Sequence, residues 1–248
     1  MSSLKGPILA LVDLDDSLFQ SLGKCRSTDS LTPAALDRKG EPLSFMEGSQ
    51  RLLWDLLAKA VVVPVTARNL SSLRRVSLKF KAGAIVSFGG LIVRPDGAID
   101  QQWRDEISPK ALRARDFLAE AWALTKSLIK VHRLAARVKI ISDDSLDFFL
   151  VVKTAPAKLR ELNFLRDELT QAYPNLGRIF LNGHNLSLLP NYLGKAKAVQ
   201  YFIQRLWEPD GDERLVLGLG DSLADREFLA LCDYILTPSR GQLAKLWP

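Results

Sequence analysis

Short apolar runs that do not alternate with polar residues are the feature that most constrains the fold of this chain. Such runs are typical of parallel strands that are buried on both faces of a sheet. Helical spacing of apolar residues separates several of them, and this alternation predicts an α/β fold with a doubly wound parallel sheet. The expected strands span residues 8–12, 60–65, 84–86, 215–219 and 234–236, and the expected helices span 46–58, 70–80 and 196–207. Pro64 is unfavourable inside the second strand, because proline cannot donate to the ladder.

The middle of the chain follows a different pattern. Ser108 is a candidate N-cap and Pro109 a first helical residue for a helix over residues 108–130. A hairpin, a helix and a second hairpin follow, which favours an antiparallel sheet with helices on one face. The expected strands span residues 137–141, 147–153, 178–181 and 185–189, and the expected helix spans 157–172. We therefore predict a Rossmann-like core over residues 1–102 and 189–248, interrupted by an α+β insertion over 103–188.

Cysteine and histidine usage excludes two kinds of site. Cys25 and Cys232 lack the CxxC spacing of zinc sites and are too few for a disulfide framework. His132 and His184 are the only histidines among the 248 residues. Any bound metal is therefore expected to be a hard cation with oxygen ligands.

The charge balance favours a small anionic partner. The chain has 34 Lys and Arg against 28 Asp and Glu, a formal net charge of +6, and its basic residues are scattered. Basic residues do not interleave with aromatic ones as they do in single-strand binders, so we expect no nucleic-acid partner. No apolar run reaches the length of a membrane span or a signal-peptide core. We expect a cytoplasmic protein without a membrane partner, and nothing in the sequence indicates its oligomeric state.

Acidic residues gather directly behind the first predicted strand. Asp13, Asp15 and Asp16 lie within four positions, and Asp221 follows the fourth strand. In open parallel sheets, ligands bind beyond the carboxyl ends of the strands, where these side chains would meet. They form either a solvated turn or a site in which Mg²⁺ offsets the repulsion between carboxylates. A site of this kind suits phosphoryl transfer, which depends on positioning and charge stabilisation.

Four segments in order resemble the motifs of the haloacid dehalogenase superfamily. "DLDDS" from Asp13 resembles the DxDx[T/S] signature, and "VVPVTAR" resembles the second motif, which ends in Thr66 here. "LSLLPNYLGKAKAV" resembles the segment that carries the motif lysine, and "GDSLAD" resembles GDxxxD. "IVSFGGLIVRPDG" resembles a hairpin of the Cof-type, sucrose-phosphatase-like subgroup, whose members carry an α+β cap. The resemblance covers essentially the whole chain and implies that residues 103–188 form the cap.

The resemblance implies roles for four catalytic residues. Asp13 would be the nucleophile, and Asp15 would be the general acid and base. Thr66 would hydrogen-bond the transferring phosphoryl group, and Lys195 would pair with the nucleophile and the phosphate. Lys197 competes with Lys195, since either lysine could instead be an exposed helical residue.

The resemblance also implies a Mg²⁺ site. Asp13, Asp221 and the backbone carbonyl of Asp15 would bind the ion, and Asp225 would support it. Asp225 could equally be no more than the cap of the following helix.

Five residues are candidates for substrate binding. Ser17 belongs to the first motif, while Arg68 and Asn69 either cap the next helix or face the substrate. Asn182 and His184 lie in the "NGHN" turn of the insertion. They are either turn residues or contributors to specificity, because a cap selects the leaving group.

The sequence departs from the family pattern at several positions. Asp16 and Ser17 replace the commoner Gly-Thr, and Ala67, Ala196 and Ala224 replace Gly, Gly and Asn. The segment from residue 20 to residue 45 is unusually long and could form a hairpin flap over the site, with "DRKGE" as its turn.

Together these features predict a Mg²⁺-dependent phosphatase for a small phosphorylated metabolite, a sugar phosphate, acting through an aspartyl-phosphate. A phosphomutase would use the same residues and return the phosphoryl group to the substrate. A non-enzymatic binding module is the third reading, and it would be expected to lack one of Asp13, Asp15, Lys195 or Asp221, all of which are present.

Overall fold

The structure, a computed structural model, describes residues 4–209 and 213–246. It divides into two compact units. The first unit comprises Met1–Trp103 and Lys195–Pro248, and the second comprises Arg104–Gly194. The boundary that we expected at residue 188 falls inside a strand that continues to Pro190. The domain assignment as a core and a cap stays a prediction.

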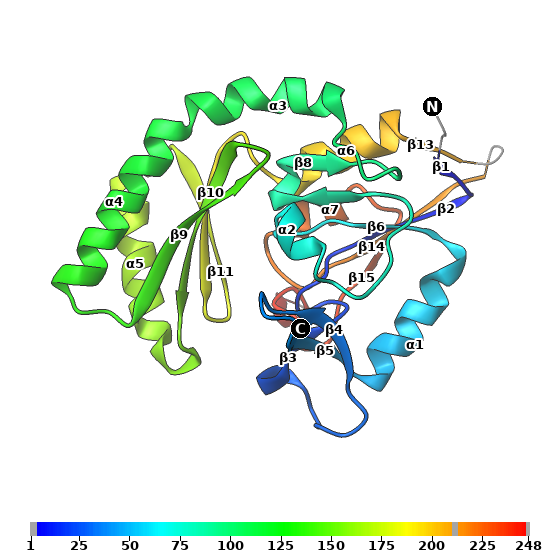
Figure 1. Ribbon diagram of the computed structural model, residues 1–248, viewed down its shortest axis with the longest axis horizontal. Coiled ribbons are helices and arrows are strands. Elements are labelled where there is room, and N and C mark those ends of the chain that lie inside the picture. Colours follow the sequence, from blue (N-terminus) through cyan, green and yellow to red (C-terminus); the bar gives the residue numbers. More distant parts are fainter. Residues whose placement is uncertain (1–3, 210–212, 247–248) are drawn as a thin grey trace. The chain divides into compact units, whose positions relative to one another are not determined.

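The parallel sheet of the first unit consists of β2 (Ile8–Val12), β6 (Val61–Pro64), β14 (Leu215–Leu219) and β15 (Tyr234–Leu236). Its strand order is β15-β14-β2-β6, and every pairing is parallel (Figure 1). This arrangement confirms the predicted α/β fold class. Pro64 is the last residue of β6, which is the outer strand of this four-stranded ladder, and a proline is tolerated there. β15 is the opposite edge and is exposed rather than buried as expected, with Tyr234 at 67% exposure.

The third predicted strand joins the sheet differently from the others. β7 (Ala84–Val86) pairs antiparallel with β8 (Leu91–Val93) and meets the end of β6 through a parallel bridge between Val65 and Ile85. The backbone amide of Thr66 donates a 2.9 Å hydrogen bond to the carbonyl of Ile85. The β7–β8 hairpin therefore fixes the backbone at Thr66.

The helices of the first unit are α1 (Gly48–Leu56), α2 (Leu70–Leu73), α6 (Lys195–Arg205) and α7 (Arg226–Leu229). The helix predicted over residues 70–80 is wrong beyond Leu73. The amide of Leu36 bonds the carbonyl of Arg75 at 2.9 Å, and the amide of Ser77 bonds the carbonyl of Ala34 at 2.8 Å. Pairing with a distant strand has taken these backbone groups from the helix, so long-range bonding overrides the local apolar spacing.

The long segment after the first motif forms a small antiparallel sheet. It consists of β3 (Gln20–Ser21), β4 (Thr32–Leu36) and β5 (Pro42–Met46) in the order β3-β5-β4. The hairpin expected around "DRKGE" is thus present between β4 and β5. A further pair, β1 (Leu4–Lys5) and β13 (Trp207–Glu208), runs parallel. Single 3₁₀ turns lie at Leu22–Lys24, Leu57–Lys59, Ser87–Gly89, Pro156–Lys158 and Ala244–Leu246.

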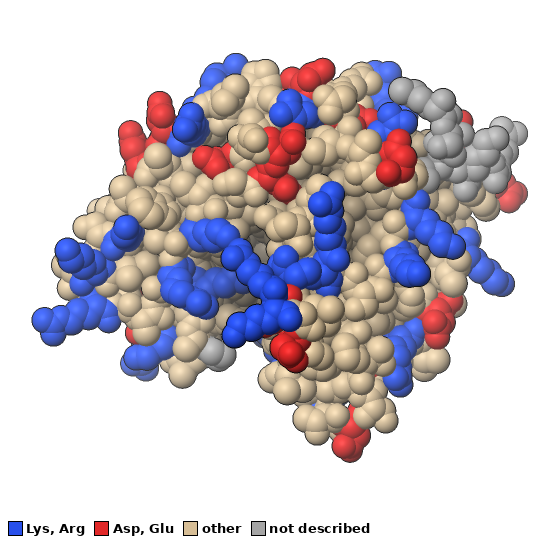
Figure 2. Space-filling view, viewed as in Figure 1, with Lys and Arg blue, Asp and Glu red and all other residues tan. Residues whose placement is uncertain are grey.

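The second unit is an antiparallel sheet with helices on one face. Its sheet has the order β11-β12-β10-β9, and α4 and α5 pack on the same face over buried leucines from both helices (Figure 1). In Figure 2, Lys and Arg side chains gather where Figure 1 draws these strands. The elements are α3 (Gln101–Arg113, which begins before the unit), α4 (Arg115–Val131), β9 (Ala136–Asp143), β10 (Leu146–Thr154), α5 (Leu159–Ala172), β11 (Gly177–Asn182) and β12 (Asn185–Pro190).

The helix start predicted at Ser108 is wrong. α3 begins at Gln101, where the Asp100 carboxylate accepts a 2.9 Å hydrogen bond from the amide of Trp103, and Pro109 lies inside the helix. The Ser108 hydroxyl donates a 2.6 Å hydrogen bond to the carbonyl of Arg104 and so occupies a helix acceptor near the proline. A stronger cap upstream therefore decides where the helix starts.

No helix among the described residues is long and apolar enough to span a bilayer.

Replacing Gly83 by alanine should test how strictly the β7–β8 hairpin constrains the backbone beside Thr66. Gly83 and Gly97 both have positive φ, +87° and +83°, so alanine at either carries a similar backbone cost, about 1–2 kcal/mol. An added Cβ at Gly83 would lie 2.2 Å from the Val93 carbonyl oxygen, whereas at Gly97 it would meet nothing within 4 Å. We expect Gly83→Ala to lower the free energy of unfolding in urea by about 3 kcal/mol or more. Equal losses for Gly83→Ala and Gly97→Ala would contradict the close approach.

Candidate active site

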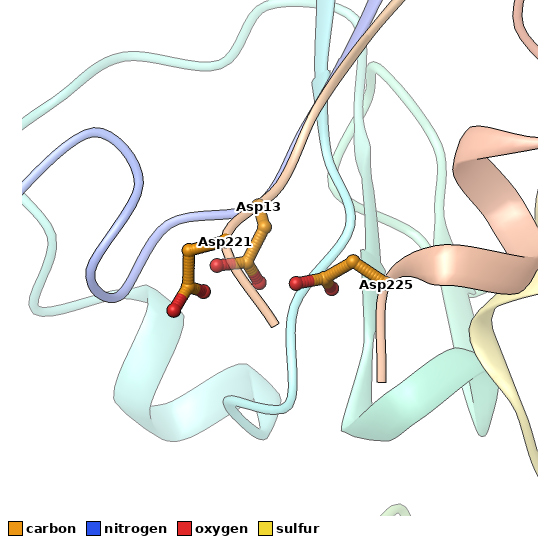
Figure 3. Close-up of side chains that lie close together, drawn as sticks. All are labelled: Asp13, Asp221 and Asp225. Atoms are coloured by element: carbon orange, nitrogen blue, oxygen red, sulfur yellow. The ribbon is translucent and has the colours of Figure 1, made fainter. Parts of the chain in front are cut away.

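Three carboxylates converge at the carboxyl end of the parallel sheet. Asp13 follows β2, and its amide donates a 2.7 Å hydrogen bond to the carbonyl of Leu219 at the end of β14. Asp221 and Asp225 follow β14, and in Figure 3 the carboxylate of Asp13 lies between those of Asp221 and Asp225. They are buried, and one oxygen from each lies within 4.8 Å of the others. The strand ends thus bring together acidic residues that are far apart in sequence.

Lys195 lies among these carboxylates. It is the first residue of α6 and is buried, and its Nζ donates to Asp13 Oδ1 at 2.6 Å and to Asp225 Oδ1 at 2.5 Å. Lys197 is exposed. Of the two lysines that the sequence left open, Lys195 is the one that contacts the predicted nucleophile.

The buried charges shift each other's ionisation. Burial raises the pKa of Asp13 well above its usual value; Lys195 opposes this rise, and the charges of Asp225 and Asp221 add to it. Burial would lower the pKa of Lys195, but the charges of Asp13 and Asp225 outweigh that effect and raise it. The cluster is therefore held by strong attraction between Lys195 and two carboxylates, and one lysine charge does not balance all three.

Asp225 has a structural position within the cluster. Its second oxygen, Oδ2, accepts hydrogen bonds from the Ser222 amide at 3.0 Å and the Ser222 hydroxyl at 2.7 Å. A Cβ on Gly220 would lie 2.7 Å from the Asp225 Cβ, so glycine allows this close approach. Asp225 occupies the N-cap position of α7, but its carboxylate binds Lys195 and Ser222 instead of the helix amides. It supports the lysine and leaves Asp13 and Asp221 better situated as metal ligands.

The cluster fits a hard divalent cation. Its donors are carboxylate oxygens, the ligands that Mg²⁺ prefers, and two positive charges would offset the repulsion that adds to the effect of burial on the pKa of Asp13. The carboxylate of Asp15 does not belong to this group of three. The expected contribution of the Asp15 backbone carbonyl stays a prediction.

Asp15 pairs with an arginine from the second motif. Arg68 donates from Nε to Asp15 Oδ2 at 2.7 Å and from Nη2 to Asp15 Oδ1 at 2.6 Å. The guanidinium also lies 5.1 Å from the centre of the Phe19 ring. Burial would lower the pKa of Arg68, but Asp15 outweighs it and raises that pKa. Asp15 itself is half-exposed, so its carboxylate is accessible to solvent.

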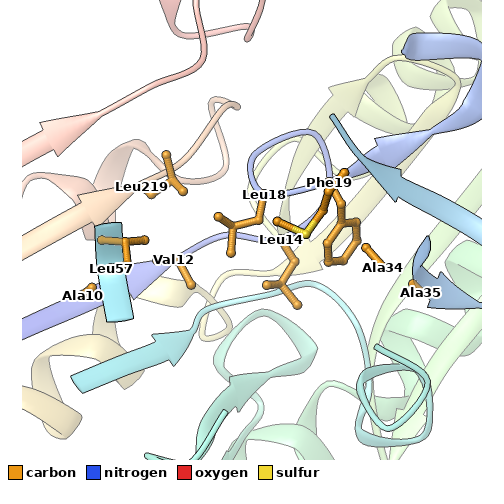
Figure 4. Close-up of a cluster of buried hydrophobic side chains, with 10 residues drawn as sticks. Ala10, Val12, Leu14, Leu18, Phe19, Ala34, Ala35, Leu57 and Leu219 are labelled. Carbon is orange, nitrogen blue, oxygen red and sulfur yellow. The ribbon is translucent and has the colours of Figure 1, made fainter. Parts of the chain in front are cut away.

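Apolar residues of the same loop fix these two aspartates. Leu14, Leu18 and Phe19 are fully buried, and they pack with residues of β2 and β4 (Figure 4). Because these apolar side chains anchor the loop in the core, Asp13 is buried at the end of β2 while Asp15 is exposed to solvent. Asp16 adopts φ +68°, a left-handed conformation that glycine adopts without strain, and its carboxylate pairs with Lys24.

Thr66 and Ser17 have hydroxyls bound to neighbours in the site. The Thr66 hydroxyl is buried and accepts a 3.1 Å hydrogen bond from the Arg68 amide. The Ser17 hydroxyl donates a 3.2 Å hydrogen bond to Asp13 Oδ2, so Ser17 orients the carboxylate. The substrate contact expected for Ser17 stays a prediction.

The other candidates for substrate binding have local roles in the structure. The Asn69 carboxamide accepts a 3.1 Å hydrogen bond from the Ser72 amide and caps α2, one of its two predicted alternatives. Asn182 and His184 flank Gly183, which has φ +55°, in the turn between β11 and β12 of the second unit. The His184 carbonyl accepts a 3.1 Å hydrogen bond from the Thr154 amide. Their role in specificity stays a prediction.

Two aromatic rings beside Lys195 were missed at the sequence level. Lys195 Nζ lies 5.8 Å from the centre of the Phe88 ring and 5.6 Å from that of Phe228. Cation–π contacts of this kind further stabilise a buried ammonium. Phe88 has φ +56°, an unusual backbone conformation for a bulky residue, and nothing in "SFGG" distinguishes it from an ordinary turn residue.

The sequence matches no protein-family model and no curated protein. Solved structures are similar in fold. Sucrose-phosphatase from Synechocystis, solved with sucrose and phosphate, has a TM-score of 0.53 at 18% identity, over 98% of this chain and 87% of that chain. A trehalose-6-phosphate phosphatase related protein has a TM-score of 0.56 at 14% identity, over 94% of this chain and 87% of that chain. The C-terminal domain of trehalose-6-phosphate phosphatase from C. albicans has a TM-score of 0.51 at 13% identity, over 89% of this chain and 72% of that chain.

At these identities the likeness concerns the fold. The fold of this chain is similar to that of the phosphatases named above.

Lys195→Met should destabilise the protein strongly. The change leaves the carboxylates of Asp13 and Asp225 buried without their cation, which typically costs about 3–5 kcal/mol. Lys197→Met is the matched control, because Lys197 is exposed on the same helix. Urea unfolding in EDTA should show a loss of that size for Lys195→Met and a change within about 0.5 kcal/mol for Lys197→Met. Similar effects of both substitutions would mean that the buried pairs do not stabilise the fold.

Proposed function

We propose that this protein is a Mg²⁺-dependent phosphatase that hydrolyses a small phosphorylated metabolite, a sugar phosphate, through an aspartyl-phosphate at Asp13. The observation that carries the proposal is the buried cluster of Asp13, Asp221 and Asp225 around Lys195 at the carboxyl end of a parallel sheet. Two of the solved structures named above support the class of substrate, because sucrose-phosphatase and trehalose-6-phosphate phosphatase act on sugar phosphates and have a similar fold. Action in the cytoplasm, without a nucleic-acid or membrane partner, is part of the proposal.

In the first step, a carboxylate oxygen of Asp13 attacks phosphorus. An O–P bond to Asp13 forms while the bond from phosphorus to the leaving oxygen of the substrate breaks. Lys195 and Ser17 hold the two oxygens of Asp13 and so fix the direction of attack. The Thr66 hydroxyl accepts from a backbone amide, so its hydrogen can be donated to a phosphoryl oxygen.

Asp15 moves the protons in both steps. As an acid it protonates the leaving oxygen, and as a carboxylate it then takes a proton from the water that attacks phosphorus and breaks the bond to Asp13. Both Asp15 oxygens accept hydrogen bonds from Arg68, which is the arrangement of a carboxylate. Donation to the leaving group therefore requires Asp15 to separate from Arg68, whereas activation of water is compatible with at least one of these bonds.

Asp13 and Asp221 would hold the metal ion, with Asp225 as support. When bound, Mg²⁺ neutralises carboxylate and phosphoryl charge and so favours the approach of two anions. The protein contributes a buried, preorganised set of oxygens for it.

Phosphate release from sugar phosphates should require Mg²⁺ and Asp13. We expect activity with Mg²⁺, little activity after EDTA treatment, and poor replacement by Ca²⁺, which takes more ligands at longer distances. Asp13→Asn should lower kcat by about 10³-fold or more, because it removes the nucleophile. Asp16→Asn is the control, since Asp16 lies in the same loop but pairs with Lys24, and asparagine tolerates its positive φ.

Product analysis distinguishes the proposal from its alternative. Free phosphate should accumulate in equal amount to the dephosphorylated sugar. Accumulation of an isomeric sugar phosphate would identify a phosphomutase, and undiminished activity after EDTA would contradict the metal requirement.

A further inference from the structure

Three consecutive residues between β7 and β8 have a left-handed backbone. Ser87, Phe88 and Gly89, which we term the left-handed turn, adopt φ values of +52°, +56° and +89°, and all three are buried. Glycine adopts this conformation freely, whereas a residue with a Cβ is strained in it and normally occurs there only singly. Strain of this kind persists where the surrounding structure enforces it, and it is common at functional sites. The left-handed turn is therefore a candidate for a role in the site beside it.

Backbone hydrogen bonds join the left-handed turn to the second motif. The amide of Ser87 donates a 2.8 Å hydrogen bond to the carbonyl of Arg68, and the amide of Phe88 donates a 3.0 Å hydrogen bond to the carbonyl of Thr66. In an extended strand successive amides point to opposite sides, whereas in a helical backbone of either hand they point the same way. The unusual conformation thus lets two neighbouring amides hold the backbone that carries Thr66.

The other end of the left-handed turn is tied to the helix that begins with Lys195. The carbonyl of Gly89 accepts a 3.0 Å hydrogen bond from the Trp103 indole, whose ring centre lies 5.1 Å from that of Tyr201 on α6. The Tyr201 hydroxyl donates a 2.9 Å hydrogen bond to Asp100, which also accepts the Trp103 amide at the start of α3. The turn is therefore held between the second motif and α6.

The side chain at the centre of the left-handed turn lies beside the buried lysine. Lys195 Nζ lies 5.8 Å from the centre of the Phe88 ring and 5.6 Å from that of Phe228 on α7. An aromatic face attracts a cation without bringing a full charge of its own, so it does not compete with Asp13 for the ammonium as a further carboxylate would. Glycine would satisfy this backbone without strain, so the ring is what phenylalanine adds here.

We infer that Phe88 is a positioning residue of the candidate active site, whose ring, together with that of Phe228, holds the Lys195 ammonium where it orients Asp13. The strained backbone brings this ring to Lys195 while its amides hold the second motif. The catalytic consequence rests on the proposed function, in which Lys195 and Thr66 contact the same phosphoryl group. A small misplacement of such groups lowers the rate of reaction strongly.

A ring that only fills the core provides the matched control. Phe202 lies on α6, the helix of Lys195, and is fully buried. Among the described residues, no contact of its ring with a cation is found. The burial of such a ring contributes through its apolar area, which does not depend on how charge is distributed over the ring face.

Fluorinated phenylalanines separate the two roles. Fluorine withdraws electrons from the ring face and weakens its attraction for a cation, while the ring stays apolar and nearly unchanged in shape. We expect mono-, di- and trifluorinated phenylalanine at position 88 to lower kcat for p-nitrophenyl phosphate stepwise, by about threefold to tenfold for the trifluorinated ring. KM should change by less than about twofold, because the orientation of the nucleophile matters chiefly in the transition state. Fluorination of Phe202 should leave kcat within about twofold of the unmodified protein.

Unfolding gives a second readout that needs no substrate. In urea with EDTA, the equilibrium constant for unfolding should rise stepwise with fluorination of Phe88 or Phe228, by about threefold to tenfold for the trifluorinated ring. The same series at Phe202 should change this constant by less than about twofold, since no cation depends on that ring.

The two readouts separate this inference from the proposed function. Equal effects of fluorination at positions 88 and 202 would overturn the inference, and so would a loss of stability at position 88 with kcat unchanged. Destabilisation specific to positions 88 and 228, without phosphate release by the unmodified protein from any sugar phosphate or aryl phosphate, would retain the hold on Lys195 and overturn the phosphatase. Phosphate release that is insensitive to fluorination at position 88 would retain the phosphatase and overturn the positioning role.

Discussion

The buried contacts of Lys195 with Asp13 and Asp225 are the interaction on which the candidate site depends. Asp13 and Lys195 are 182 positions apart in sequence, and the whole second unit lies between them along the chain. Their pairing closes the first unit across that insertion and sets the orientation of the nucleophile. Glycine at 220 lets Asp225 approach this pair, and the ring of Phe88, which has an unusual positive φ, lies beside the ammonium.

The first unit gathers like charges at a cost in stability. Burial raises the pKa of Asp13, and the neighbouring carboxylates of Asp225 and Asp221 add to that rise. A divalent cation would relieve the repulsion between these carboxylates. The candidate site thus lies where buried carboxylates repel one another and the contacts within the chain do not fully balance their charge.

The sequence predicted what depends on local pattern, and it failed where distant contacts decide. The bounds of β2, β7 and β14 were predicted to the residue, because buried apolar runs mark strands directly. The helix over residues 70–80 failed because the backbone beyond Leu73 pairs with β4. The contact of Asp15 with Arg68 and the rings beside Lys195 were not foreseeable, since they join separate loops. Motif spacing nevertheless favoured Lys195, which is the lysine that contacts Asp13.

The most direct test of this account is to trap the covalent intermediate. Rapid quenching during turnover, followed by borohydride reduction, converts an aspartyl-phosphate to homoserine, which mass spectrometry can locate within the tryptic peptide of residues 6–24. We predict homoserine at Asp13 and an unmodified Asp15, because Asp13 is the carboxylate that Lys195 and Ser17 hold for attack. Turnover without modification of Asp13, or modification at Asp15 instead, would contradict the assignment of the nucleophile.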